Sequence, residues 1–236
     1  MRVINFFGGP GAGKSTAAAG LFYELKKRWF RAELVTEFAK ELVWSGSSHL
    51  LSEQNFIFAT QEHRLSRLIG QVDVALSDSP LLLSAYYAPD SYAVSFRQSV
   101  FDFFSTYENI NIFVRRSHEY SAAGRLQNQQ EADAIGRTME EFLLANGIPY
   151  YAITASDASP RYLLRWLVDA GILDMPDTAT PFTEDDLPPE GWMTPSLLLR
   201  RDAQGEPIKA GNAVGERHID PWVRRVGDKE EPASIP

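Results

Sequence analysis

A glycine-rich segment close to the N-terminus carries the clearest chemical signal in this sequence. Residues 8–15, GGPGAGKS, match the pattern G-x-x-x-x-G-K-[ST] (Walker A) at every fixed position. Glycines suit such a loop because backbone N–H groups must turn inward around a phosphate, and a side chain at Gly8 or Gly13 would obstruct them. Lys14 is expected to contact the β- and γ-phosphates of a nucleotide, and the Ser15 hydroxyl to coordinate Mg²⁺. The residues predicted to bind ATP are Gly9, Pro10, Gly11, Ala12, Gly13, Lys14, Ser15 and Thr16.

Two carboxylates stand where short apolar runs end, and both are candidates for chemistry at a bound phosphate. Asp78 follows the run VALS, and Glu37 follows the run LVT. Because parallel sheets hold their ligands outside the carboxyl ends of the strands, both side chains are expected to face the glycine-rich loop. Asp78 is predicted to hold Mg²⁺ together with Ser15 or to orient an acceptor hydroxyl, and Glu37 to act with it in catalysis. The alternatives are a turn or cap role for Asp78 before Pro80 and a solvent-exposed first-turn position for Glu37.

Arg115, Arg116 and Arg125 form a third group, in a stretch without strong helical periodicity before about residue 130. This stretch is predicted to be a lid that closes over the phosphates and excludes water. Phosphoryl transfer spreads negative charge over the equatorial oxygens, which a guanidinium can contact with two N–H groups. Arg116 and Arg125 are therefore predicted to be catalytic. The alternative is a surface loop whose arginines face solvent.

The elements that must position these residues follow from the hydrophobic pattern. Short apolar runs alternate with longer stretches of helical periodicity, which is typical of βαβ units that build a parallel sheet. Five strands are expected, at residues 3–7, 32–36, 72–77, 110–114 and 150–153. The glycine-rich loop lies between the first expected strand and the first expected helix, which is the context that its pattern requires. The sequence therefore predicts an α/β fold with helices on both faces of a five-stranded parallel sheet.

The chain is expected to form one domain with an extension. At 236 residues and 44% hydrophobic residues it can bury one substantial core, which we place in residues 1–174. Nine of the 14 prolines fall in the last 61 residues, so residues 175–236 are expected to form an irregular extension. Trp192 and Trp222 suggest that this extension packs on or beside the domain. It would either complete the core as a surface wrap or bind an acceptor or a partner.

The overall composition limits the partners and the location. A net charge of -8 and a pI near 5.1 provide no overall attraction for nucleic acid, although a local basic groove is compatible with them. The chain has no cysteine for disulfides or thiolate metal ligands, and no stretch approaches the about 18 apolar residues of a membrane span. We expect a cytoplasmic protein with no membrane partner.

The order of these motifs along the chain resembles that of the P-loop nucleoside and nucleotide kinases. The phosphate loop is followed by Glu37, by Asp78-Ser79-Pro80 and by Gly124-Arg125. Among these kinases, the sequence is most similar to the nicotinamide riboside kinase domain and its phage-encoded relatives, over roughly residues 1–170. The resemblance implies a sheet ordered 2-3-1-4-5, with ATP and Mg²⁺ over the first strand and the acceptor between the ends of the second and third strands. The chain differs from the common deoxynucleoside kinase pattern because Ser79-Pro80, and not an arginine, follows Asp78.

The function implied by this resemblance is transfer of the γ-phosphoryl group of ATP to a hydroxyl of a nucleoside-type acceptor, such as a nucleoside or a nicotinamide riboside-like metabolite. Related phage enzymes phosphorylate the hydroxymethyl group of 5-hydroxymethyluracil in DNA, so DNA is an alternative acceptor. A regulatory P-loop ATPase is a further alternative, but it would be expected to carry Asp-Glu where this chain has Asp78-Ser79.

Cations near the expected acceptor site bear on the choice of acceptor. A free nucleotide would need charge-assisted donors for its own phosphate. The nearest candidates in the sequence form a thin set on helices: Lys40, Arg64 and Arg67. This pattern favours a neutral hydroxyl over a nucleotide phosphate as the acceptor.

Overall fold

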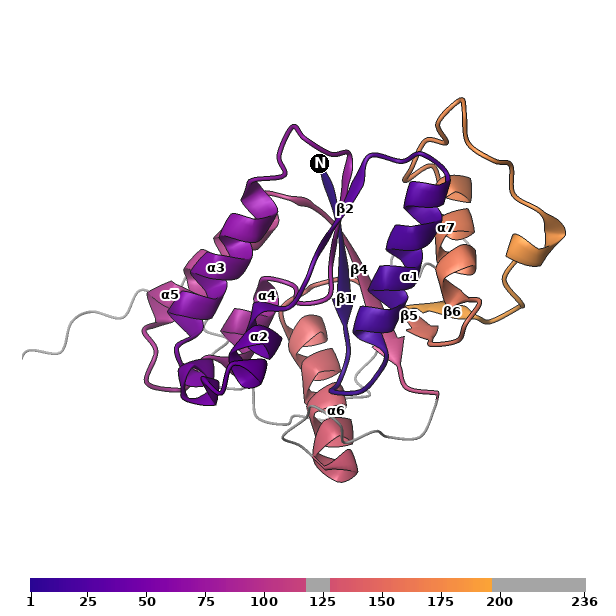
Figure 1. The fold of residues 1–236 in the computed structure, drawn as a ribbon. Helices are drawn as coiled ribbons and strands as arrows, with labels where there is room; N and C mark the ends of the chain where they lie inside the picture. Colours follow the sequence, from indigo (N-terminus) through magenta and orange to yellow (C-terminus); the bar gives the residue numbers. More distant parts are fainter. Residues whose placement is uncertain (118–127, 197–236) are drawn as a thin grey trace, which may run out of the picture.

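The chain folds around a six-stranded sheet in the computed structural model, which describes residues 1–117 and 128–196 (Figure 1). The strands are β1 Arg2–Phe7, β2 Ala32–Val35, β3 Val74–Ser77, β4 Glu108–Arg115, β5 Tyr151–Thr154 and β6 Met193–Pro195. Their order across the sheet is β2-β3-β1-β4-β5-β6. The first five strands are parallel, which confirms the predicted strands and the predicted order.

The sixth strand corrects the expectation of a five-stranded sheet. β6 pairs antiparallel with β5 at the edge of the sheet, with Met193 opposite Ile153. β6 is only three residues long, which is too short to show an alternating pattern in the sequence. It ends in Pro195, which is tolerated because an edge strand leaves one side unpaired.

Helices cover both faces of the sheet, as predicted (Figure 1). They are α1 Lys14–Lys27, α2 Phe38–Trp44, α3 Gln54–Ser66, α4 Leu82–Tyr87, α5 Val94–Ser105, α6 Gln129–Ala145 and α7 Ser159–Asp169, with 3-10 turns η1 Ser48–Ser52 and η2 Glu184–Asp186. Side chains alternate along β1: Ile4 and Phe6 pack with α1 and α7, whereas Val3 and Phe7 pack with α4, α5 and α6. No helix in the described ranges is long and apolar enough to cross a membrane.

The strand register brings the predicted site residues to one edge of the sheet. Asn5 of β1 pairs with Ser77 of β3, and Ser77 pairs with Val35 of β2. The phosphate loop, Asp78 and Glu37 each follow one of these strands within a few residues. They therefore leave three neighbouring strands at the same carboxyl edge.

Residues 170–196 run along α1, α7 and β5. Arg28 at the end of α1 is buried and forms ion pairs with Glu24 and with Asp186 of η2, the latter at 3.5 Å. Its guanidinium also lies 5.0 Å from the centre of the Phe182 ring. Near the phosphate edge, the indole N–H of Trp192 donates to the Ser159 hydroxyl. The first part of the proline-rich segment is thus packed against the domain.

Candidate active site

The phosphate loop connects β1 to α1 and depends on glycine at two positions. Gly13 has φ 95° and stands immediately before the first turn of α1, in the left-handed region that L side chains rarely adopt. Gly8 has φ 140°, and a Cβ atom there would lie 2.6 Å from the carbonyl oxygen of Val114. The structure therefore agrees with the argument that side chains at these two positions would obstruct the loop.

Lys14 folds back over this loop. Its ammonium group donates hydrogen bonds to the carbonyl oxygens of Gly8 (2.8 Å) and Gly9 (3.1 Å). The first backbone N–H groups of α1, together with the positive end of the helix dipole, lie at the same place. The loop and Lys14 together form a cradle suited to a polyphosphate.

Asp78 lies next to the cradle and is only 6% exposed. It does not cap a helix, since α4 begins at Leu82 with Leu81 before it. Burial raises the pKa of the Asp78 carboxyl, and the Ser15 hydroxyl and the Lys14 ammonium group lower it in part. Within the described residues, Asp78 Oδ1 is buried without a hydrogen-bond partner. These observations disfavour the cap alternative.

Glu37 lies at the first position before α2, yet its side chain does not cap that helix. Burial raises the pKa of the Glu37 carboxyl, Lys14 lowers it, and the neighbouring charge of Asp78 raises it further. The ammonium group of Lys40 also acts on both carboxyls and lowers the pKa of each. The structure thus brings Lys14, Asp78 and Glu37 into one electrostatic cluster.

The other cations near the expected acceptor side are already engaged. Arg64 forms a bidentate ion pair with Glu41, with N–O distances of 2.8 and 2.7 Å, and its guanidinium lies over the Phe38 ring. Arg67 donates to the backbone carbonyl of Arg64 on the same helix. Of the three cations named from the sequence, Lys40 is the one whose charge acts on the two carboxyls.

Two arginines at the end of β4 both pair with carboxylates of α6. Arg116 forms an ion pair with Asp133 in the first turns of α6, while Arg115 pairs with Glu140 at 2.6 Å. The start of α6 adjoins the phosphate loop, since a Cβ atom on Gly9 would lie 2.5 Å from the carbonyl oxygen of Ala132. Arg116 is therefore held beside the helix that contacts the loop. Arg125, the other predicted catalytic arginine, lies outside the described residues.

Two parts of this edge were not identified from the sequence. Ala155 after β5 contacts the phosphate loop, because a Cβ atom on Gly13 would lie 3.3 Å from the Ala155 Cβ. Gln61 of α3 hydrogen-bonds to the backbone on both sides of Glu37. Neither belongs to a pattern, and both reach the site through tertiary contacts.

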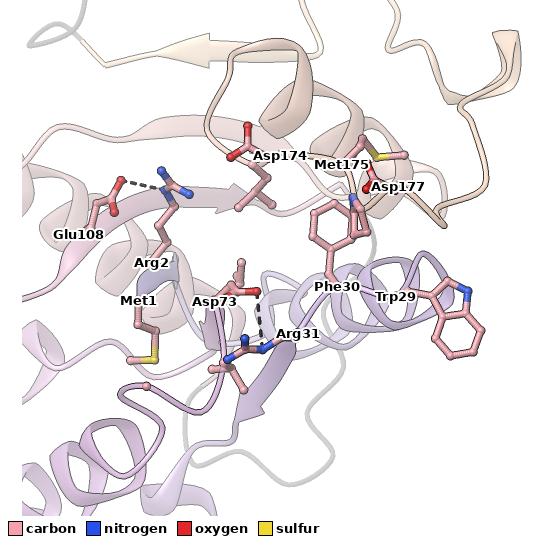
Figure 2. A pocket seen from close by; sticks show the side chains of 15 residues that line it. Met1, Arg2, Trp29, Phe30, Arg31, Asp73, Glu108, Asp174, Met175 and Asp177 are labelled. Atoms are coloured by element: carbon pink, nitrogen blue, oxygen red, sulfur yellow. Dashed lines mark hydrogen bonds and ion pairs between the residues drawn. The ribbon is translucent and has the colours of Figure 1, made fainter.

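A hollow of about 820 Å³ lies at the opposite edge, where β1, β3 and β4 begin (Figure 2). Its charged residues include the ion pairs Arg2–Glu108 (2.8 Å) and Arg31–Asp73 (3.8 Å). It contains none of the residues of the phosphate cradle. The candidate active site is therefore at the edge where the loop, Lys14 and the two carboxylates converge, and not at this hollow.

Comparison with protein families assigns the domain. A family model described as an AAA domain matches residues 3–161, which is more than half of the chain. The chain belongs to this AAA-domain family. No protein of curated function matches the sequence significantly.

Among solved structures, this AAA domain is similar to two kinases. A deoxyadenosine kinase from M. mycoides, solved with the products dCMP and a flexible dCDP, is 16% identical; the match covers 72% of this chain and 100% of that chain, with a TM-score of 0.45. A variant of the APS kinase of Mycobacterium tuberculosis is also 16% identical; the match covers 61% of this chain and 97% of that chain, with a TM-score of 0.32.

The donor set of the AAA domain fits a nucleotide with Mg²⁺. Magnesium prefers hard oxygen ligands and keeps several waters, so a hydroxyl and one carboxylate are a sufficient protein contribution. Ser15 and Asp78 offer these groups side by side, and the buried Oδ1 of Asp78 lacks a partner among the described residues. The residues present therefore suit the predicted cofactors, ATP and Mg²⁺.

Proposed function

We propose that this AAA-domain protein is an ATP-dependent kinase that phosphorylates a hydroxyl of a nucleoside-type acceptor. The proposal rests chiefly on the cluster of Lys14, Asp78 and Glu37 at the carboxyl edge of the sheet. One carboxylate adjoins the hydroxyl of the phosphate loop and suits a metal ion. The other is not used as a helix cap and suits a hydroxyl group.

Each residue of the cluster has a distinct role in this proposal. Lys14 neutralises the β- and γ-phosphate oxygens, exchanging its bonds to the loop carbonyls for bonds to phosphate. Asp78 and Ser15 would hold Mg²⁺, and the bound ion would neutralise charge on the transferred group. Glu37, with its pKa raised by burial, accepts the proton of the acceptor hydroxyl. Arg116 breaks its ion pair with Asp133 and binds the negative charge on the equatorial oxygens.

A neutral acceptor is favoured by the state of the cations on that side. The Arg64 guanidinium is neutralised by Glu41, and the Arg67 side chain is bonded to its own helix. A monophosphate acceptor would then have to rely on Lys40, whose charge the two carboxylates already attract. Burial raises the pKa of the Tyr87 phenol, and Tyr86 and Glu37 raise it further, so Tyr87 lies near the carboxylate. The residue is 44% exposed, which makes the ring a candidate to contact a base.

A panel of acceptors tests this proposal. Purified protein is incubated with γ-labelled ATP, Mg²⁺ and, separately, nucleosides, nicotinamide riboside, nucleoside monophosphates and DNA containing 5-hydroxymethyluracil, with Lys14→Ala as the control. We expect label on a nucleoside-type hydroxyl. Transfer to monophosphates alone, or ATP hydrolysis without transfer to any acceptor, would contradict the proposal, the latter indicating a regulatory ATPase.

Salt dependence separates a free nucleoside from the DNA alternative. A polymer bound through several phosphates loses affinity steeply as salt rises, whereas a neutral nucleoside is hardly affected. The Michaelis constant of each accepted substrate is therefore measured at low and at physiological salt. Because the net charge is -8, we expect a constant that is nearly independent of salt.

A further inference from the structure

We infer that Gln61 of α3 is a positioning residue that holds Glu37 in its catalytic orientation; this inference rests on the kinase function proposed above. Gln61 is 3% exposed although it lies in the polar stretch TQEHR. A buried amide must find hydrogen-bond partners for its N–H and its C=O group inside the protein, so these partners indicate its role.

The partners of Gln61 are the two peptide groups that flank Glu37. Its Nε2 donates to the carbonyl oxygen of Thr36 at 3.2 Å, and its Oε1 accepts from the backbone N–H of Phe38 at 3.2 Å. Glu37 is the residue between these two bonds. One side chain therefore restrains the backbone on both sides of the carboxylate.

Gln61 also satisfies one of the free N–H groups at the start of α2. The residue before a helix commonly accepts a bond from a first-turn N–H through its own side chain. Here Gln61 accepts the bond from Phe38, the first residue of α2, and Glu37 makes no side-chain cap. The Glu37 carboxylate makes no helix cap and lies in the electrostatic cluster with Lys14 and Asp78.

Arg64 reinforces the same attachment about one turn further along α3. It donates to the carbonyl oxygen of Thr36 at 3.4 Å while it pairs with Glu41 in the first turn of α2. The connection from β2 to α2 is thus fixed to α3 at two successive turns. Because general-base catalysis requires a carboxylate held at hydrogen-bond distance from the hydroxyl, loss of this attachment should reduce turnover more than ATP binding.

A pair of glutamine variants tests the inference. Gln61→Met keeps the length of the side chain and removes both bonds. Gln54→Met is the matched control, because Gln54 is also buried on α3 (5% exposed) but donates to Leu51. With ATP, Mg²⁺ and the acceptor panel described above, Gln61→Met should lower kcat about 10- to 100-fold and change the KM for ATP less than about threefold. The control should stay within about twofold of the wild type. Equal losses in both variants, or none in Gln61→Met, would overturn the inference.

The variant Gln61→Glu gives a readout that a purely structural role would not produce. When protonated, the introduced carboxyl can donate to Thr36 and accept from Phe38, as the amide does. When ionised it cannot donate, and it repels Glu37. The ratio of its kcat to that of the wild type should therefore fall as pH rises from 5 to 8, and a constant ratio would contradict the inference.

The variant Glu37→Gln distinguishes failure of this inference from failure of the proposed function. If Glu37→Gln retains full turnover, Glu37 has no catalytic role and both ideas fail. If it loses turnover while Gln61→Met does not, only the inference fails. The double variant should lose no more than Glu37→Gln alone, since Gln61 acts through Glu37.

A titration provides a test that needs no acceptor. The carboxyl carbon of Glu37 is followed by NMR, with Glu37→Gln used for assignment. Burial raises the pKa of this carboxyl in the wild type. In Gln61→Met we expect the pKa to move towards that of an ordinary glutamate, because the released carboxylate can reach solvent; an unchanged titration would contradict the inference.

Discussion

At the scale of single residues, the site holds two carboxyl groups in surroundings that disfavour their ionised form. Asp78 is almost fully buried, and burial raises the pKa of both Asp78 and Glu37 while Lys14 lowers it. Carboxylates kept in such an environment cost stability. An active site typically retains them because they interact with a ligand that supplies the missing positive charge.

Removal of the cation tests the phosphate cradle. Lys14→Ala should lower phosphoryl transfer about 100- to 1,000-fold, since the ammonium group meets charge that develops in the transition state. The fold should persist because the Lys14 side chain is only partly buried and bonds to loop carbonyls. Turnover and thermal unfolding are measured together; turnover equal to the wild type would refute this role.

Asp78→Asn should make the ligand-free protein more stable and less active. The raised pKa of Asp78 means that its stabilising contribution is present at low pH and is lost as pH rises through the folded-state pKa. At pH 8 the asparagine variant should therefore gain about 1 kcal/mol in free energy of unfolding, the usual gain when an active-site charge is removed. This gain should shrink towards pH 5. Turnover should fall about 100-fold or more.

Urea unfolding at the two pH values checks this prediction. Asp73→Asn is the control, because Asp73 precedes the same strand but is exposed at the opposite edge. A loss of stability at pH 8 with normal turnover would instead assign Asp78 to a structural turn.

At the scale of elements, α6 connects the parts of the site. Its start packs against the phosphate loop at Gly9, and Thr138 on the same helix hydrogen-bonds the Tyr86 hydroxyl of α4 at 2.6 Å. The helix begins with a capping box between Asn128 and Glu131, so its first turn is well defined. Displacement of α6 should therefore disturb the loop.

Two glycine substitutions test this contact from either side. A Cβ atom on Gly9 would lie 2.5 Å from the carbonyl of Ala132, so Gly9→Ala should cost about 2 kcal/mol of stability and weaken ATP binding. A Cβ atom on Gly136 would make ordinary contacts at 3.6 Å, so Gly136→Ala should gain up to about 1 kcal/mol from helix propensity. Calorimetry measures the stability and the ATP affinity of both variants. A change of stability in the same direction in the two variants would refute the packing argument.

At the scale of the whole molecule, residues 170–196 pack along one side of the domain, against α1, α7 and β5. Arg28 and Arg165 both lie over the Phe182 ring, with guanidinium carbons 5.0 and 5.1 Å from its centre. Asp186 pairs with Arg28 and caps η2 by accepting from the Thr183 N–H at 2.8 Å. A buried arginine depends on such partners, so this segment contributes to stability.

Asp186→Ala should therefore lower the free energy of unfolding by about 3 kcal/mol, because Arg28 is left buried with one carboxylate fewer. Asp185→Ala, an exposed neighbour in the same turn, should change it by less than about 0.5 kcal/mol. Chemical unfolding gives the free energy of unfolding of both variants, and ATP binding is measured alongside. Equal stability of the two variants would show that the segment is only loosely attached.

The sequence alone determined the phosphate loop, the five parallel strands and the positions of Asp78 and Glu37 at the strand ends. These features rest on local rules: glycine is favoured where φ is positive, as at Gly13, and a strand buried on both faces is rich in apolar residues, as at Val74, Ala75 and Leu76 of β3. The sheet order, taken from the family resemblance, was also correct.

Only the tertiary structure decided which polar groups are available for chemistry. Arg64, Arg115 and Arg116 all looked accessible in the sequence, yet each pairs with a carboxylate on a different element. Gln61 meets its partners across 23 and 25 residues of chain, and β6 pairs with a strand about 40 residues earlier. Such contacts leave no local pattern, because they arise from packing between elements whose own periodicity reports only which face is buried.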